Sequence, residues 1–233
     1  MTQQYNFLKT YTQRLIERAK VTPDIGLWSG RMGAAIYLLH LAHIIQNGEY
    51  EKTASELIEA VSEKLSYETP FSYAGGLLGV GCDFEYIIAN GFVEGDSDEV
   101  LAEIDHLTRH NVDIRPFDTL SLGDVVCGIG HYFYHRLRNK LPDDDSAITL
   151  KNKEALIYLV DWIEELLLKT KNKNEMGDTY FLLCRLRELN VIHFKIDKML
   201  AYCLRKIADF NYLTYDNYEL LGIHSLKLLR QWM

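Results

Sequence analysis

This sequence of 233 residues lacks the features that mark several well-known protein classes. Its formal net charge is -8, so it has no basic excess with which to neutralise the phosphates of nucleic acid or an anionic membrane. No apolar run is long enough to cross a bilayer, and no G-x-x-x-x-G-K-[ST] phosphate loop occurs. We therefore expect neither nucleic acid nor a membrane among its partners.

Cysteine is scarce and scattered. The four cysteines are Cys82, Cys127, Cys184 and Cys203, and they form no C-x-x-C motif. This spacing favours reduced thiols over a disulfide framework. The first twenty residues are polar and amphipathic, without the apolar core of a signal peptide, so we expect a cytoplasmic protein.

Proline is also rare, and its positions separate segments with helical periodicity. The four prolines, Pro23, Pro70, Pro116 and Pro142, all fall between such segments, where a missing backbone N–H does no harm. No segment shows convincing strand alternation. The sequence therefore predicts an all-α protein.

Five glycines recur at a nearly constant interval, each opening a mostly apolar stretch such as GRMGAAIYLLHLA. They are Gly33, Gly79, Gly128, Gly177 and Gly222, at spacings of 46, 49, 49 and 45 residues. A helix N-terminus with glycine can bind an anion. A motif repeated five times instead favours a packing role, in which glycine lets a helix start or its entering loop approach a neighbour closely.

Amphipathic stretches with one apolar stripe lie between these apolar ones. They cover residues 5–19, 51–65, 96–110, 154–168 and 194–210. The segment 96–110 begins with DSDE, the pattern of a helix N-cap with a capping-box partner. The chain thus alternates outer helices, charged on one face, with inner helices that need neighbours on every side.

Ten helices in five outer–inner pairs predict a single domain over residues 1–233, an α/α toroid of five helical hairpins. A ring gives each inner helix a neighbour on both sides. An open solenoid is the alternative, and it would need polar caps at its ends. The last inner-type helix, 218–233, shows no such cap, so we expect it to close on the first pair or to pack against another chain in a homodimer.

The helix starts in GLWSGRMGAAIYLLHLA, GGLLGVGCDFEYIIANGF and CGIGHYFYHRL resemble the repeat motif of the lanthionine synthetase C-like family. The run EYIIANGFVEGDSDEVLAEID is similar to a segment of Bacteroidetes-type members. The resemblance implies an α/α toroid. In active members it also implies a zinc ion at the mouth, which activates a peptide cysteine for addition to a dehydrated serine or threonine. The product is the thioether ring of lantibiotic biosynthesis.

The family's zinc motifs place cysteine, or Cys-His, just before the first glycine of these helix starts. The equivalent positions here hold neither residue: Trp28 and Ser29, Ala74 and Gly75, Gly123 and Asp124, Asn172 and Lys173, and Asn217 and Tyr218. A catalytic zinc site needs three convergent protein ligands. The sequence therefore predicts a short family member without a cofactor that binds a peptide or partner protein, or assists peptide modification.

Eight residues are candidates for a pocket or peptide-binding surface at the mouth formed by the inner-helix starts. They are Trp28, Arg31, Tyr73, Asp83, Asp124, His131, Asp178 and His224. Aromatic side chains beside an arginine suit a peptide surface, although packing of the loops also accounts for them. The carboxylates favour the helix dipole, or they could form the acid–base pair of a glycoside hydrolase.

Two histidine pairs have the spacing of metal ligands on a helix. His40 and His43 are three residues apart, and His131 and His135 are four apart, with Asp124 and Cys127 upstream. The other interpretation of His40 and His43 is that they are ordinary helical histidines near the outer layer, and that of His131 and His135 is burial beside aromatic residues. Three further functions stay open at this point: a zinc cyclase with unconventional ligands, a carbohydrate-active enzyme, and an interaction module with a filled centre.

Overall fold

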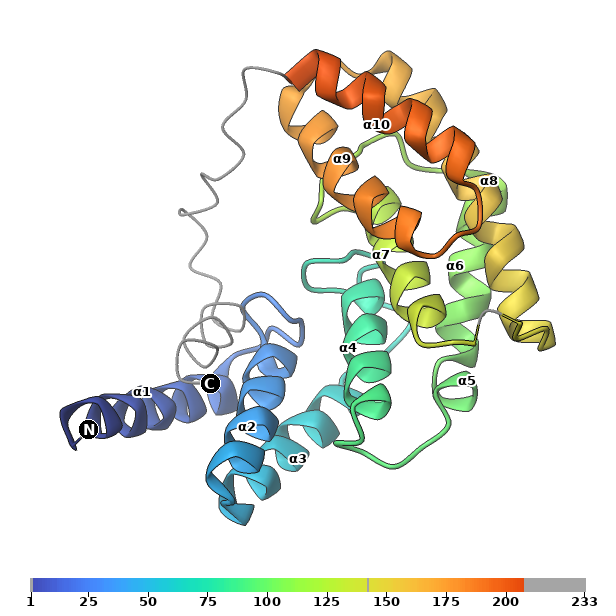
Figure 1. Cartoon of the computed structure of the whole chain (residues 1–233). Helices are drawn as coiled ribbons and strands as arrows, with labels where there is room; N and C mark the ends of the chain where they lie inside the picture. Colours follow the sequence, from blue (N-terminus) through green and yellow to red (C-terminus); the bar gives the residue numbers. More distant parts are fainter. Residues whose placement is uncertain (1, 142, 208–233) are drawn as a thin grey trace. The chain divides into compact units, whose positions relative to one another are not determined.

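The computed structural model describes residues 2–141 and 143–207, and these residues form ten helices and no strand (Figure 1). The all-α prediction is confirmed. None of the helices in this part of the chain is both long and apolar enough to cross a membrane. The expected helix 218–233, with Gly222 and His224, lies outside the described residues. The described residues divide into two compact units, residues 2–70 and residues 71–207 without 142.

The first unit contains α1 (Thr2–Val21), α2 (Arg31–Ile45) and α3 (Gly48–Ser62). A two-residue turn joins α2 to α3: Gln46 adopts a left-handed conformation with φ 53°, and the Asn47 side chain caps α3 by accepting from the Glu49 N–H at 2.9 Å. The Thr12 and Tyr37 hydroxyls, 2.8 Å apart, tie α1 to α2.

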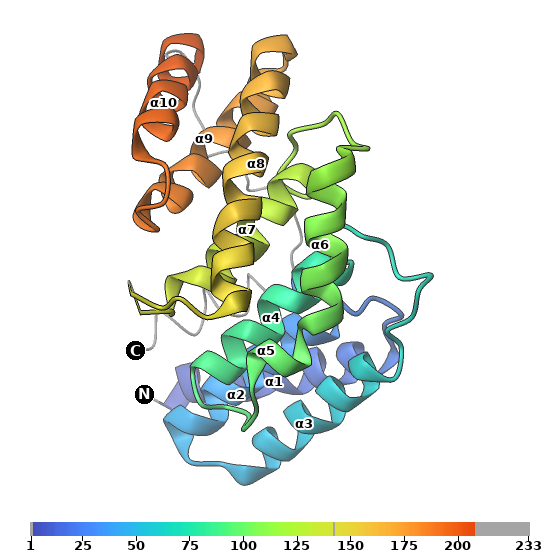
Figure 2. The ribbon, with the colours of Figure 1, turned by 90° about the vertical axis from the view of Figure 1, so that its right-hand side faces the viewer.

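The second unit packs two rows of helices against each other (Figures 1 and 2). One row is α4 (Leu77–Ala89), α7 (Val125–Arg138) and α9 (Lys173–Glu188), and the other is α6 (Ala102–Ile114), α8 (Ala147–Lys169) and α10 (His193–Ile207). The central helix α7 contacts α4, α8 and α9. Most residues of α4 and α7 are buried, as expected for helices that are apolar nearly all round.

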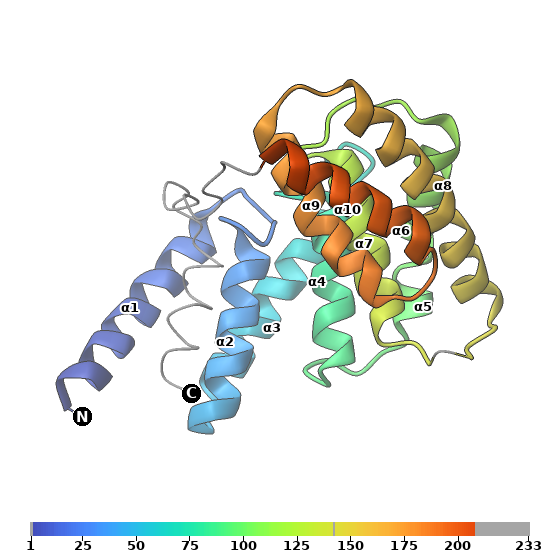
Figure 3. The same ribbon diagram turned by 45° about the horizontal axis from the view of Figure 1, so that its top comes forward.

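The helical hairpins differ from the predicted ones. We predicted that each outer helix forms a hairpin with the inner helix after it. In the structure, an inner helix forms the hairpin with the outer helix that follows: α2 with α3, and α9 with α10 (Figure 3). The reason is the length of the connections. Only residues 46–47 separate α2 from α3 and residues 189–192 separate α9 from α10, and short connections force antiparallel neighbours.

Two helix boundaries also differ from the expected ones. The segment 96–110 is interrupted at Leu101, which separates a short α5 (Ser97–Val100) from α6 because this leucine turns into the core and is 1% exposed. The expected N-cap is confirmed, since Asp96 accepts from the Asp98 N–H at 2.8 Å. Helix α8 begins seven residues earlier than expected, where the Ser146 hydroxyl caps it through the Thr149 N–H.

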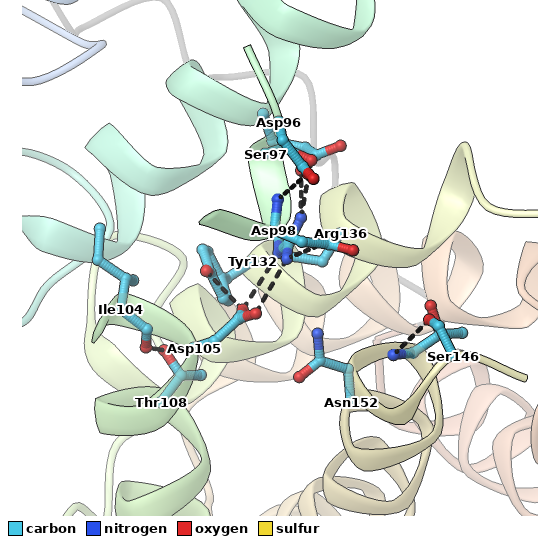
Figure 4. A network of polar contacts seen from close by, with 12 residues as sticks. Asp96, Ser97, Asp98, Ile104, Asp105, Thr108, Tyr132, Arg136, Ser146 and Asn152 are labelled. Carbon is cyan, nitrogen blue, oxygen red and sulfur yellow. Dashed lines mark hydrogen bonds and ion pairs between the residues drawn. The ribbon is translucent and has the colours of Figure 1, made fainter. Parts of the chain in front are cut away.

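Four helices of the second unit meet at a buried arginine (Figure 4). Arg136 of α7 donates to both carboxylate oxygens of Asp105 on α6, at 3.1 and 2.9 Å. It also donates to Glu85 of α4 at 2.6 Å, and to Ser97 and Asp98 of α5 at 3.1 and 2.7 Å. The Tyr132 hydroxyl donates to Asp105 at 2.7 Å. The five bonds that Arg136 donates use all five N–H donors of its guanidinium.

Candidate functional site

The structure assigns the predicted site residues to both units. Trp28 and Arg31 belong to the first unit, while Tyr73, Asp83, Asp124, His131 and Asp178 belong to the second. His224 lies outside the described residues. The Arg31 guanidinium donates to the Thr22 carbonyl at 3.2 Å, so it fastens the loop that enters α2.

Glycines at two helix starts clamp the loop that carries Tyr73. A Cβ on Gly79 would lie 2.1 Å from the Tyr73 carbonyl oxygen, and one on Gly128 would lie 2.8 Å from the Tyr73 Cβ. The Tyr73 N–H donates to the Gly123 carbonyl at 3.3 Å. The packing role predicted for the repeated glycines is therefore confirmed at these two positions: they let the starts of α4 and α7 hold one loop between them.

The clamped Tyr73 ring stacks on His131 of α7. Their ring centroids are 4.9 Å apart with an interplanar angle of 19°, and Phe181 of α9 lies 5.9 Å from the imidazole on another side. Burial, together with the nearby His135 and Arg185, lowers the pKa of His131 to about 3. Its Nε2 has no hydrogen-bond partner among the described residues. His131 is thus a neutral imidazole enclosed by aromatic rings.

Asp83 lies on α4 and is only 3% exposed. Burial raises its pKa well above the usual range, and its Oδ2 has no hydrogen-bond partner among the described residues. Burial also raises the pKa of Tyr73, and Cys82 and Asp83 contribute to that increase. Asp83 is therefore a neutral carboxylic acid in the interior, whereas the sequence suggested a carboxylate at an open mouth.

The other carboxylates at the helix starts accept hydrogen bonds from loop residues: Asp124 and Glu175 from the loops before their own helices, and Asp178 of α9 from the loop before α7. Asp178 accepts from the Leu122 N–H at 2.9 Å, Asp124 accepts from the Thr119 hydroxyl at 3.2 Å, and Glu175 accepts from the Thr170 hydroxyl at 2.5 Å. These contacts agree with the helix-start interpretation of the acidic residues. The acid–base pair of a carbohydrate-active enzyme stays a prediction.

A line of aromatic and charged side chains runs along α7 and α9. The guanidinium of Arg185 lies 5.5 Å from the centroids of both the Phe181 and the Tyr134 rings, and Arg138 lies 5.3 Å from the Tyr134 centroid. The Tyr134 hydroxyl donates to Glu188 at 2.5 Å. We call this line the α7–α9 strip. It consists of Tyr73, His131, Tyr134, Arg138, Phe181, Arg185 and Glu188.

Sequence reasoning found only Tyr73 and His131 of the α7–α9 strip. The remaining members were missed because the sequence cannot show which face of α9 meets α7. A signal existed in the spacing, since Phe181, Arg185 and Glu188 follow one another by four and three residues and so share one helix face. Neither Arg138 nor Arg185 has a carboxylate within ion-pair distance among the described residues.

Comparison with known proteins adds no assignment. No protein-family model matches the chain, and no curated protein matches it. Function must therefore be argued from the site itself.

The residues present do not fit the zinc ion that the family resemblance implies. Among residues 2–141 and 143–207, no three His, Cys, Asp or Glu side chains converge to hold a metal ion. His131 and His135 lack a third ligand, and the His131 ring lies against Tyr73 and Phe181. The Cys127 thiol, upstream of them, is buried and donates to the Leu120 carbonyl at 3.1 Å. We therefore assign no chemistry to a zinc ion here.

Proposed function

We propose that this chain is a lanthionine synthetase C-like protein that binds a peptide through the side chains of the α7–α9 strip that reach the surface, such as Phe181 and Arg138, and lacks zinc-dependent cyclase chemistry. The helix starts that resemble the family's motif and the alternation of two helix types support the family assignment. An α/α toroid of five helical hairpins is part of this proposal, because the repeat spacing favours it and the resemblance implies it.

The arrangement of Phe181, Arg185 and Tyr134 carries the peptide-binding proposal. Phe181 is 40% exposed although it is a large apolar side chain, and a guanidinium stacks on it. Aromatic residues and arginine are the side chains enriched in binding hot spots. The planar guanidinium offers paired donors to carbonyl or carboxylate groups. We therefore expect the bound peptide to carry apolar residues next to acidic ones.

Binding of defined peptides tests this proposal. Fluorescently labelled, C-terminally amidated 15-residue peptides, rich in Leu, Asp, Ser and Thr, are titrated with the full chain, and matched peptides with Lys in place of Asp serve as the charge control. We expect Phe181→Ala and Arg185→Gln each to weaken binding of the acidic peptides about tenfold, the scale of a hot-spot residue.

Phe194 provides a matched control variant. It is also a surface phenylalanine of the second unit, 86% exposed on α10, and it is not part of the strip. Phe194→Ala should leave peptide affinity unchanged. The proposal is wrong if no acidic peptide binds, or if Phe194→Ala weakens binding as much as Phe181→Ala does.

Metal analysis tests the absence of zinc chemistry. We expect purified protein to hold no stoichiometric zinc, and we expect added zinc not to promote ring closure in a peptide that carries one cysteine and one dehydroalanine. Stoichiometric zinc, or a thioether product that forms only with the protein present, would overturn this part of the proposal and favour an active cyclase with unconventional ligands.

A further inference from the structure

A pocket of about 630 Å³ lies where α7 and α9 end. It is lined by the end of α7 and the loop after it, by Lys153 of α8, and by Glu188 and the three residues that follow α9. Tyr134, Arg138 and Glu188 also belong to the α7–α9 strip, so the strip leads into the pocket. The volume is in the range that holds a small ligand or a few residues of a peptide.

The pocket contains more positive than negative charge, although the whole chain is acidic. Three cations and one carboxylate line it. Lys140 is already paired with Asp98 at 3.0 Å, and Glu188 accepts from Tyr134. Two cations, Arg138 and Lys153, have no carboxylate within ion-pair distance among the described residues.

The surroundings of these two cations leave donors for an anion. Arg138 is exposed, and its Cζ lies 5.3 Å from the centroid of the Tyr134 ring. A guanidinium carries five N–H donors that an acceptor can use. Lys153 donates to the backbone carbonyl of Asp144 at 3.1 Å, and an ammonium has two further N–H groups. A carboxylate is a suitable acceptor for both.

Helix dipoles explain only part of this charge pattern. Arg138 lies in the last turn of α7, where a cation is favourable even without a ligand. Lys153, however, lies in the second turn of α8, which begins at Ala147, far from the C-terminus where the dipole would stabilise a cation. The helix dipole therefore does not account for Lys153 at the pocket.

The other pocket walls are apolar, with Leu137, Leu141, Leu189 and Val191. A ligand that contacts both the cations and the apolar side chains carries a carboxylate next to an apolar group. We propose that this pocket binds the free C-terminal carboxylate of a peptide whose last residue is apolar, with Arg138 and Lys153 contacting the carboxylate. This inference rests on the proposed peptide-binding function and adds the end of the peptide that is recognised.

The test compares two short probes that differ only in the terminal group. Acetyl-Gly-Leu-Leu with a free carboxylate and the same tripeptide with a C-terminal amide are titrated into the full chain and followed by calorimetry. We expect the acid to bind at least ten times more tightly than the amide. Arg138→Gln and Lys153→Gln should each weaken binding of the acid five- to tenfold, and Lys153→Gln, which lies outside the strip, should leave binding of the amide unchanged.

Lys169→Gln is the matched control, because Lys169 is a second surface lysine of α8 and does not line the pocket. The two lysines are about 24 Å apart along the helix axis at the usual rise per residue. This variant should bind the acid as the unmodified chain does. Equal affinity for acid and amide, or an equal effect of Lys169→Gln and Lys153→Gln, would overturn the proposal. Displacement of the acid by an equal concentration of inorganic phosphate would also overturn it, because it would show recognition of any anion.

Failure of this inference can be told apart from failure of the proposed function. Lys153 lines the pocket and is not part of the strip, while Phe181 is part of the strip and does not line the pocket. If the amidated 15-residue peptides still bind in a Phe181-dependent way while the acid tripeptide shows no preference, only the pocket proposal fails. If those long peptides do not bind at all, the proposed function fails whatever the tripeptides do.

Discussion

Removing the guanidinium of Arg136 should cost the second unit a large part of its stability. The Arg136 side chain is 0% exposed, and its partners Asp105 and Glu85 are 2% and 5% exposed. Arg136→Met keeps most of the apolar stem but leaves both carboxylates buried without the cation. Breaking a buried ion pair from one side costs about 3–5 kcal/mol. For a chain of this size that is a fall in Tm on the order of 10 °C, at about 2–4 °C per kcal/mol.

The measurement is urea and thermal unfolding followed by circular dichroism at 222 nm, at pH 7. Two further variants serve as controls. Arg187→Met removes an arginine that pairs with Asp197 at the surface, both about half exposed, and should leave Tm nearly unchanged. Arg136→Met combined with Glu85→Gln and Asp105→Asn removes the unpaired charges and should recover most of the loss, because a buried polar site without net charge no longer requires the cation.

Two results would refute this reasoning. If Arg136→Met is as stable as Arg187→Met, the guanidinium is not enclosed as the structure describes it. If the triple variant is no more stable than Arg136→Met alone, the loss comes from the packing of the arginine stem and not from unpaired carboxylates.

Three more predictions concern the neutral buried groups and the glycine clamp. The pKa of His131 is about 3 in the folded protein and near 6.5 when unfolded, so the unfolded state takes up the extra proton and stability falls as pH drops from 6.5 toward 3. Urea unfolding at pH 7.0 and 4.5 should therefore show a smaller acid loss for His131→Phe than for the unmodified chain, and an equal loss contradicts the prediction. Asp83 has the opposite effect on the pH dependence of stability. Its pKa is raised in the folded state, so its stabilising contribution is lost as pH rises above the pKa of the unfolded state. Asp83→Asn should thus gain stability relative to the unmodified chain between pH 4 and pH 8, and a difference that does not change with pH would exclude a buried neutral acid. Gly79→Ala should lower the free energy of unfolding by about 1–3 kcal/mol because its Cβ would collide with the Tyr73 carbonyl. In the matched Gly48→Ala, where nothing lies within 4 Å of the added Cβ, no loss is expected, and equal losses in both variants would contradict the clamp.

Much of the helical organisation could be predicted from the sequence because the signals are local. The positions of the apolar residues predict which helices are buried all round, and α4 and α7 agree with that prediction. The Asp96 cap depends on a contact two residues along the chain, so a short pattern was enough to predict it. The break at Leu101 could not be predicted in this way, because the burial of that leucine between helices of the second unit causes it.

The candidate site could be predicted only in part. Tyr73 and His131 stood out because they lie near helix starts that resemble the family's motif, and the structure places their rings in contact. The partners Phe181 and Arg185 come from α9, which belongs to a separate hairpin, so their distance from α7 could not be predicted from the sequence. Asp83 illustrates a further limit: its charge state depends on burial, and no pattern in the sequence reports burial of a single acidic residue.

The sequence by itself determined that the described residues are helical, where most of their helices lie, and that Gly79 and Gly128 serve close packing. These properties follow from backbone propensity and from apolar periodicity over a few turns, which depend on neighbours in the chain. Tertiary structure decided which charged residues are buried together, which are left neutral, and which arginines remain without a carboxylate in the described part of the chain. These properties depend on desolvation and on distances between helices such as α7 and α9, and both arise only when the helices pack.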